Sequence, residues 1–410
     1  METVKVTEDR QIEDLLNWAL ADKKVINLFG QGTKQAIGRP ISADVNLTMQ
    51  ALTGVTLYEP AELVMRARAG STLVDIQKTL DDAGQMMAFA PPDYGPLLGQ
   101  PQGQSTLGGV FACNLSGSDR IKAGAARDHL LGVEGFTGRG EPFHTGSRVM
   151  KNVTGYDLCK LIAGSYGTLA VATEFTFKVL PKAEKVRTIL IFGEALDDAV
   201  KTMNRAMSSV HEVSAAAYLP VGIAARTGID LVSDQGQAVT AIKVEGPAPS
   251  AEFRCNALRE MFKDARGIEE LHGSRSRAFW TYMGNVTAFA EDQTSVIWKV
   301  SVPPSDAGRY IADVTADYPE LDYFCDWAGG LIWLSLPSSA PNGGEARVRA
   351  ALQGGHATLI RGSEKLRQEI SPFQPLDPIK ARISESIREG FDPQMILNAG
   401  RLYAPAPEEG

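Results

Sequence analysis

Glycine is concentrated in one part of this chain, and that concentration limits the folds open to it. Fifteen of the 40 glycines in the 410-residue sequence lie between Gly95 and Gly167. Few segments in this stretch have the apolar spacing of an amphipathic helix. Glycine adopts positive φ with little strain and lets other groups approach the backbone closely. This stretch is therefore expected to turn tightly or to lie against something flat.

The segments on either side have clearer helix and strand patterns. Before the glycine-rich stretch, we expect a helix over 8–21 capped by Thr7, strands near 25–29, 45–47, 55–58 and 63–69, and a helix from Thr72 to Gly84. An alternating strand over 171–179 follows the stretch and stops at Pro181. Beyond it, strands near 188–192, 239–243, 296–300, 323, 331–336 and 356–360 alternate with helices, the last over 378–388. The fold class is predicted to be α+β.

A chain of this length is too long for one ordinary core, so we expect two domains. The charged run Pro181–Lys185 is the predicted boundary. We divide the chain into a first domain over 1–181, a second α+β domain over 182–375, and a C-terminal segment over 376–410 that returns to the first domain.

Composition excludes several classes of function. The net charge of −8 argues against binding a nucleic acid, which relies on clustered Lys and Arg. The sequence has no signal-peptide pattern at its start and no apolar run long enough to span a bilayer, so a cytoplasmic protein is expected. Its four cysteines form no C-x-x-C pair, so neither a zinc nor an iron–sulfur site is expected.

A glycine loop, Gly30-Gln31-Gly32-Thr33-Lys34, directly follows the strand predicted near 25–29. In a dinucleotide-binding fold such a loop opens a long helix, but Gly38 and Pro40 leave no room for one here. The loop nevertheless offers backbone N–H groups, a hydroxyl and a lysine, which together can hold a pyrophosphate. On this loop alone, an anion site and a ligand-free hairpin turn are equally good interpretations.

Three further segments accompany the loop in a fixed order. They are Gln104-Ser105-Thr106-Leu107-Gly108-Gly109 with Asn114-Leu115-Ser116-Gly117, then Lys151-Asn152-Val153-Thr154-Gly155-Tyr156 with Gly164-Ser165-Tyr166-Gly167-Thr168-Leu169-Ala170-Val171, and finally Phe391-Asp392-Pro393 with Leu397-Asn398-Ala399-Gly400-Arg401. In order and spacing the set resembles the vanillyl-alcohol-oxidase (PCMH-type) family of FAD-binding domains, and within it the E subunits of bacterial glycolate oxidases. The resemblance implies a two-subdomain FAD-binding domain followed by an α+β cap domain.

The resemblance also implies which residues bind FAD. Gly30, Gln31, Gly32, Thr33 and Lys34 would hold the pyrophosphate. Thr106, Gly108 and Gly109 would follow the pyrophosphate and the flavin edge, and Ser116 and Gly117 would add polar backbone. Gly164, Gly167, Thr168 and Val171 would border the adenosine, and Asn398 and Arg401 would close the flavin site. Lys151 and Arg401 are the candidate cations for the flavin's N1–C2=O edge.

Two positions depart from the family's pattern: Phe29 stands where relatives carry Arg, and Ala399 where they carry Pro. Some relatives attach the flavin through a histidine near the phosphate loop. No histidine lies there in this chain, so noncovalent FAD is expected. His129 is interpreted as a structural loop residue and not as a covalent anchor.

Substrate chemistry is harder to assign, and no catalytic residue is predicted. Oxidation of a 2-hydroxy acid needs a base and a cation for the carboxylate. Relatives that perform it carry a histidine cluster in the cap, but here Asp326-Trp327-Ala328-Gly329-Gly330 contains no histidine. Arg361 could bind a carboxylate, although a lone arginine more often forms a salt bridge.

Three hypotheses therefore stay open. The first is an electron-relaying FAD subunit that works beside a catalytic flavoprotein subunit and an iron–sulfur subunit of glycolate oxidase. The second is a self-sufficient FAD-dependent 2-hydroxy-acid dehydrogenase. The third is a non-enzymatic scaffold that has lost the flavin. Under the first, the chain would reach the inner membrane only through its partner subunits.

Overall fold

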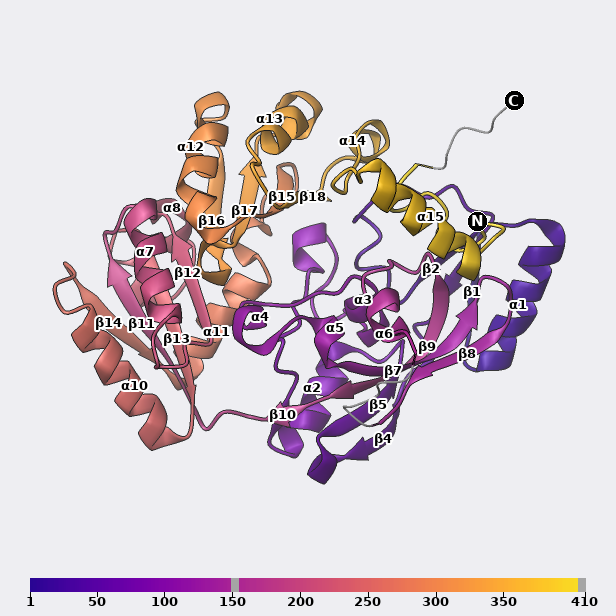
Figure 1. Cartoon of the computed structure of the whole chain (residues 1–410), viewed down its shortest axis with the longest axis horizontal. Helices are drawn as coiled ribbons and strands as arrows, with labels where there is room; N and C mark the ends of the chain where they lie inside the picture. Colours follow the sequence, from indigo (N-terminus) through magenta and orange to yellow (C-terminus); the bar gives the residue numbers. More distant parts are fainter. Residues whose placement is uncertain (149–154, 405–410) are drawn as a thin grey trace. The chain divides into compact units, whose positions relative to one another are not determined.

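In the computed structural model, which describes residues 1–148 and 155–404, three short strands near the N-terminus form a parallel sheet (Figure 1). Strand β3 (Val45–Thr48) lies between β1 (Glu2–Lys5) and β2 (Ile26–Phe29). Helix α1 (Asp9–Asp22) connects β1 to β2 and buries Ile12, Leu16 and Ala19. Its N-cap is Glu8 and not the predicted Thr7, because the Gln11 side chain accepts hydrogen bonds from the backbone N–H groups of both residues.

A second, antiparallel sheet has the strand order β4-β5-β9-β7-β8. The strands are β4 (Val55–Glu59), β5 (Val64–Arg68), β7 (Leu130–Thr137), β8 (Pro142–Gly146) and β9 (Ala170–Lys178). Helix α3 (Leu107–Ala112) packs against β9 through aromatic rings, with the Phe111 and Phe175 ring centroids 5.1 Å apart. Three other elements belong here: α2 (Leu73–Asp82) and the pair of two-residue strands β6 (Gln85–Met86) and β10 (Leu180–Pro181).

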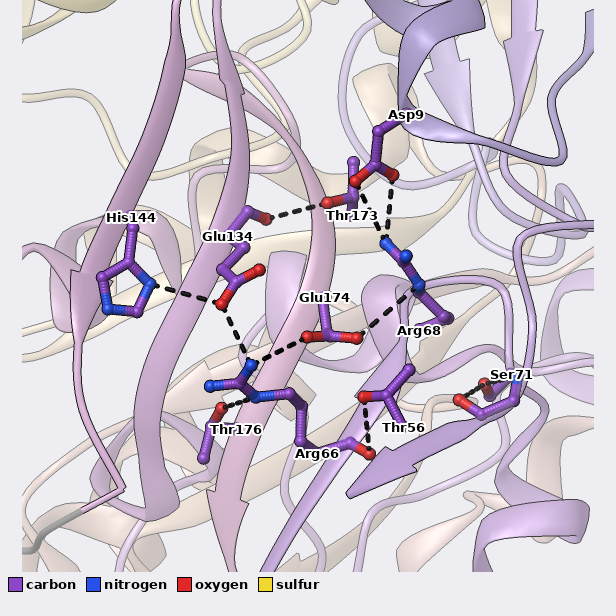
Figure 2. Close-up of polar contacts among 11 residues, drawn as sticks. Asp9, Thr56, Arg66, Arg68, Ser71, Glu134, His144, Thr173, Glu174 and Thr176 are labelled. Carbon is purple, nitrogen blue, oxygen red and sulfur yellow. Dashed lines mark hydrogen bonds and ion pairs between the residues drawn. The ribbon is translucent and has the colours of Figure 1, made fainter.

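An ion-pair network crosses this five-stranded sheet (Figure 2). The buried carboxylate of Glu174 on β9 lies 3.4 Å from Arg66 Nη1 and 3.6 Å from Arg68 Nε, both on β5. Arg66 also pairs with Glu134 on β7 at 3.1 Å, and Arg68 with Asp9 of α1 at 3.0 Å. Because Glu174 is shared by two arginines, the network ties three strands and helix α1 together.

The C-terminal segment returns to the N-terminal sheet (Figure 1). Helix α15 (Pro378–Phe391) precedes a turn in which Leu397 forms a parallel bridge with Ile26 of β2. The backbone N–H of Asn398 donates to the Ile26 carbonyl at 3.0 Å. This return agrees with the sequence prediction, and it places residues from both ends of the chain in one unit.

By its contacts the chain divides into two units. The first contains Met1–Leu115, Ala125–Lys182 and the chain from Ser371 onward. The second contains Ser116–Gly124 and Ala183–Ile370. The main difference from the sequence division is that Ser116–Gly124 falls within the predicted first domain but belongs to the second unit. The buried Lys243 ammonium explains the difference, since it donates to Asp119 Oδ1 at 2.6 Å. The other boundaries lie after residues 182 and 370, where 181 and 375 were predicted.

The second unit is built on an eight-stranded antiparallel sheet of order β14-β11-β13-β12-β16-β17-β15-β18. Its strands are β11 (Lys185–Phe192), β12 (Ala215–Leu219), β13 (Val239–Gly246), β14 (Ile268–His272), β15 (Val296–Ser301), β16 (Asp322–Asp326), β17 (Leu331–Leu336) and β18 (His356–Arg361). One face is covered by α7 (Leu196–Met207), α10 (Ala248–Met261), α12 (Ala307–Asp317) and α13 (Glu345–Ala350). Apolar strand residues such as Trp298, Ile332 and Ile242 point into these helices.

The other face of this sheet is more polar. Side chains alternate between the faces along a strand, so Thr188, Lys243 and Lys299 lie opposite the helix-covered core. Helix α11 (Gly273–Gly284) covers one end of this face, where Trp280 Nε1 donates to Thr188 Oγ1 at 2.8 Å. The remaining α-helices are short: α4 (Arg120–Ala123), α5 (Ala126–His129), α6 (Leu158–Ile162), α8 (Val221–Ala224), α9 (Asp230–Ser233) and α14 (Glu364–Glu369). Over the described parts of the chain, no helix combines the length and apolar character needed to cross a membrane.

Candidate functional site

A pocket of about 770 Å³, part of it open to solvent, lies within the first unit. Ten of the seventeen residues predicted to bind a cofactor line it: Gly30, Gln31, Gly32, Thr33, Lys34, Thr106, Gly108, Gly109, Gly167 and Arg401. They come from four stretches that are far apart in the sequence.

The glycine loop forms one wall of the pocket at the end of β2. Gly32 has φ +78°, a conformation that residues with a Cβ rarely adopt. A Cβ on Gly30 would overlap Thr106 Oγ1, so the loop can approach the start of α3 only because this position is glycine. The next element of regular structure after the loop is β3, which agrees with the prediction that no long helix follows. The loop's anion-binding groups are therefore backbone and side chain, without a helix dipole.

Lys34 is a buried cation in this wall, with a relative exposure of 6%. Its ammonium donates to Ser105 Oγ at 2.9 Å and to Thr33 Oγ1 at 3.2 Å, both neutral acceptors. It forms no ion pair with any residue that the structure describes. Burial lowers the pKa of Lys34 from its ordinary value, with smaller opposing effects from Cys113 and Asp93.

Arg401 brings a second buried cation from the C-terminal segment, also 6% exposed. Its Nη2 donates to the Lys34 carbonyl at 2.7 Å, and its buried Nε has no hydrogen-bond partner among the described residues. Burial lowers the pKa of this guanidinium too. Two desolvated cations without an acidic partner are costly unless an anion joins them. The pocket is therefore chemically suited to a ligand with a negatively charged group.

Other lining residues were not among those predicted. Cys113 and Tyr166 are the most notable, and burial raises the pKa of both side chains. Tyr166 has φ +55° and lies with its ring 4.9 Å from that of Phe373. It stands between Ser165 and Gly167, so its place within a motif already recognised was the one sequence signal that could have identified it. Smaller and apolar side chains, among them Met49, Ala112, Ala172 and Phe175, complete a wall that a flat ring system can contact.

Six predicted residues do not line this pocket, and one lies outside the described residues. Ser116 and Gly117 belong to the second unit, where Trp327 Nε1 donates to the Gly117 carbonyl at 3.1 Å. The other four residues support the walls of the pocket. Val171 is buried in β9, and Thr168 Oγ1 donates to the Ser165 carbonyl at 2.7 Å. Gly164 has φ +86°, and the Asn398 side chain hydrogen-bonds backbone groups of neighbouring segments. Lys151 is the residue outside the described ranges.

Two residues singled out from the sequence, His129 and Arg361, are both buried. His129 is buried with its ring 5.2 Å from that of Phe89, and it does not line the pocket. Arg361 is buried as well, and its guanidinium donates to the carbonyls of Phe289 at 2.8 Å and Ser295 at 3.1 Å. Because backbone carbonyls already occupy that guanidinium, Arg361 is not a free carboxylate binder.

Known proteins show the same organisation. Residues 2–146 match the FAD binding domain family. Over 95% of both chains, the sequence is 32% identical to the glycolate oxidase subunit GlcE of Escherichia coli K12. This chain belongs to the GlcE family of FAD-binding proteins. It is also 25% identical to the glycolate oxidase subunit GlcD of Bacillus subtilis, over 92% of this chain and 83% of that one. This chain is therefore an FAD-dependent oxidoreductase.

Solved structures confirm the fold. p-Cresol methylhydroxylase superposes with a TM-score of 0.70 over 97% of this chain and 88% of its own, at 14% identity. Alkyldihydroxyacetonephosphate synthase gives a TM-score of 0.70 over 97% and 76%, at 17% identity. The chain therefore has the vanillyl-alcohol-oxidase type of fold that the sequence motifs predicted.

Proposed function

We propose that this chain is the FAD-binding subunit of a multi-subunit glycolate oxidase and relays electrons from a catalytic flavoprotein subunit to an iron–sulfur subunit. The buried, ion-pair-free cations Lys34 and Arg401, which line one pocket with the glycine loop, support the FAD site. The likeness to a glycolate oxidase subunit over 95% of the chain supports the complex.

In this proposal the chain's residues bind the cofactor mainly through backbone and charge. The N–H groups of Gly30 to Lys34 hold the pyrophosphate, while Lys34 and Arg401 neutralise it. Ser105 keeps the Lys34 ammonium in place, and Thr106 caps α3 by accepting a hydrogen bond from Gly109 N–H at 3.2 Å. When bound, FAD supplies the capacity to accept two electrons together and to pass them on singly. The iron–sulfur centre that receives them belongs to a partner, since the four cysteines of this chain are dispersed.

FAD binding is expected to be noncovalent, because no histidine lies near the glycine loop in the sequence and neither His129 nor His144 lines the pocket. Purified protein should absorb as a flavoprotein, and acid precipitation should release the flavin into the supernatant. Flavin retained in the washed pellet would contradict noncovalent binding. Protein that takes up no FAD under any reconstitution condition would overturn the proposed function and favour the scaffold hypothesis.

The role in a complex is tested by expressing the chain alone and with the neighbouring glycolate oxidase subunits. Glycolate-dependent dye reduction should appear only in the co-expressed complex. A complex that omits this chain but keeps full activity would refute the relay role.

A second candidate function is a self-sufficient 2-hydroxy-acid dehydrogenase. It is favoured by 24% identity to the D-lactate dehydrogenase of Anaerostipes hadrus over 88% of this chain and 80% of that protein. Robust turnover of a 2-hydroxy acid by the isolated chain would establish it in place of the relay.

A further inference from the structure

Helix α15, drawn in yellow in Figure 1, carries an apolar stripe on its surface. Ile379, Ile383 and Ile387 follow one another at intervals of four residues, which places them on one face of the helix. Ile379 is 65% exposed and Ile383 53%, while Ile387 is half-buried. Over the whole of this helix, all of which the structure describes, no side chain is buried. The helix therefore has an amphipathic pattern without a core contact to account for it.

Hydrogen bonds at its two ends hold α15, and its stripe takes no part in them. At the N-terminus, Asp377 Oδ1 accepts hydrogen bonds from the N–H groups of Ile379 at 3.1 Å and Lys380 at 3.0 Å. At the C-terminus, Arg139 Nε in the β7–β8 turn donates to the Gly390 carbonyl at 2.9 Å. A helix of this length is only marginally stable in water unless one of its faces packs against something. Covering the stripe would therefore stabilise α15.

Opposite charges lie along one flank of the stripe. Arg382 and Glu389 are seven residues apart, which is close to two helical turns, so both lie on the same side of the isoleucines. Arg382 forms no ion pair with any residue that the structure describes. Glu389 is attracted to Arg388, but that guanidinium already binds both carboxylate oxygens of Glu385, at 2.6 Å and 3.0 Å. This flank is thus basic near the start of the helix and acidic near its end.

The charge on the other flank determines which helix orientation is compatible. Lys380 lies there, across the isoleucines from Arg382, and pairs with Asp377 at 2.9 Å. In a parallel pair of such helices the two different flanks face each other, so Arg382 of one copy would approach Lys380 of the other. In an antiparallel pair each flank faces the same flank of the other copy, so Arg382 meets Glu389. Only the antiparallel orientation brings opposite charges together.

The antiparallel register that pairs these charges also pairs the isoleucines. When Arg382 lies opposite Glu389 of the second copy, Ile383 lies opposite Ile387 of that copy to within about one residue's rise, 1.5 Å. Each contact then occurs twice, as in an interface with two-fold symmetry. The charge pattern and the apolar pattern therefore agree on one arrangement of two copies.

We propose that this chain forms a two-fold dimer through α15, in which a second copy of the chain covers the isoleucine stripe. Between Asp377 and Phe391 there are three acidic and three basic side chains, whereas a helix bound to an anionic membrane surface carries an excess of Lys and Arg. One helix from each copy is a small interface, so the dimer dissociates on dilution. No residue of α15 lines the flavin pocket, so the dimer does not depend on the proposed function.

Sedimentation velocity of the full-length flavoprotein from about 1 to 200 μM tests the dimer, since that range covers the dissociation constants of small interfaces. The wild type should change from monomer to dimer as its concentration rises. Ile383→Asp places a charge in the stripe and should weaken the dimer by about tenfold or more. Phe253→Asp is the matched control, because Phe253 is an apolar side chain of 70% exposure that lies on α10 in the second unit. It should dimerise like the wild type.

Charge reversal tests the orientation without touching the stripe. In the antiparallel pair Arg382→Glu brings carboxylates together and Glu389→Arg brings guanidinium groups together, so each variant alone should dimerise about threefold to tenfold more weakly. An equimolar mixture of the two variants places opposite charges at both contacts, and it should form a heterodimer about as tightly as the wild type dimerises. Both positions are exposed, so neither substitution disturbs a core.

A wild type that stays monomeric, an Ile383→Asp variant that dimerises normally, or a mixture no tighter than its components would overturn the proposal. So would a monomeric wild type whose stripe has another occupant. In that case Ile383→Asp would lose either a co-expressed glycolate oxidase subunit or flotation with phosphatidylglycerol vesicles. Flavin absorbance, recorded on each sample, separates this proposal from the proposed function. A flavin-loaded monomer refutes the dimer alone, and a dimer that takes up no flavin refutes the cofactor role alone.

Discussion

The side chain of Asn398 hydrogen-bonds both backbone groups of Leu28, a residue 370 positions earlier. Its Oδ1 accepts from Leu28 N–H at 2.7 Å, and its Nδ2 donates to the Leu28 carbonyl at 3.2 Å and to the Tyr166 carbonyl at 2.8 Å. Asn398 therefore acts as an extra strand residue at the edge of β2, next to the glycine loop. Its contribution to the pocket is to hold two of its walls together.

Replacing Asn398 tests that contribution. Asn398→Ala removes three hydrogen bonds and leaves backbone groups of Leu28 and Tyr166 unsatisfied, at a cost of about 1–3 kcal/mol each where they are buried. The variant should unfold at a lower denaturant concentration and release FAD faster than the wild type. Chemical unfolding and flavin release measured together check this. Unchanged FAD retention would show that the two walls are held independently of Asn398.

Gly32→Val should abolish FAD binding while circular dichroism stays unchanged. A β-branched residue is strained at φ +78° and would reorient the N–H groups of the loop. Gly84→Val is the control, because Gly84 also has positive φ (+65°) but lies outside the pocket with open space around it. If both variants keep FAD, the loop is not the pyrophosphate site.

Lys34→Met should have opposite effects on stability and on binding. In the apo protein the pKa of Lys34 is depressed, so the folded state binds fewer protons than the unfolded state between that depressed pKa and about 10.5. Wild-type stability should rise with pH through this window, and the variant should lack that rise. Replacing an unpaired buried charge by methionine should stabilise the apo protein at neutral pH by about 1–4 kcal/mol and weaken FAD binding. Thermal unfolding of the apo forms and FAD titration measure the two effects.

Asp326 should give the free energy of unfolding a pH dependence opposite in sign to that of Lys34. Burial raises its pKa to about 6, so between about pH 4 and 6 the folded state binds more protons than the unfolded state. Its contribution to the free energy of unfolding should fall as pH rises through this window, by about 3 kcal/mol in total. Asp326→Asn should remove that slope in urea unfolding measured from pH 4 to 6. An identical slope in wild type and variant would exclude Asp326 as its source.

In the ion-pair network of Figure 2, two similar substitutions should lower the free energy of unfolding by different amounts. Glu174→Gln removes a buried carboxylate shared by Arg66 and Arg68, and should cost about 1–3 kcal/mol. Glu134→Gln removes a half-exposed one, and should cost under about 1 kcal/mol. Urea unfolding of both variants compares them. Equal costs would mean that the buried position of Glu174 adds nothing.

Local motifs allowed much of the site to be predicted from sequence. The loop over 30–34 and the start of α3 could be recognised because neighbouring residues determine their backbone. The polar face of the eight-stranded sheet could not be recognised, since the run Val296–Ser301 reads as an ordinary strand and only sheet register pairs Lys299 with Trp333. Cys113 and Tyr166 were missed for a similar reason, because their exposure to the pocket depends on segments distant in sequence.

The prediction of secondary structure from sequence failed where one residue pattern hid another. Strand β7 (Leu130–Thr137) lies between β9 and β8, yet its glycines made it look irregular. In α10 the large apolar side chain of Phe253 is 70% exposed, whereas the buried positions include Cys255 and Arg254. Arg254 is accommodated there because it donates to the Glu245 carbonyl at 2.8 Å. Periodicity cannot anticipate an arginine that satisfies its hydrogen bonds inside a core.

The return of the C-terminal segment to β2 has a consequence for biogenesis. During translation the glycine loop leaves the ribosome early, but Arg401 and Asn398 are made only after the whole of Ala183–Ile370. Domains fold as units while synthesis proceeds, so the eight-stranded sheet can assemble before the flavin pocket has both of its cations. Cofactor loading is then a late step, and nascent chains stalled before residue 398 should carry no flavin.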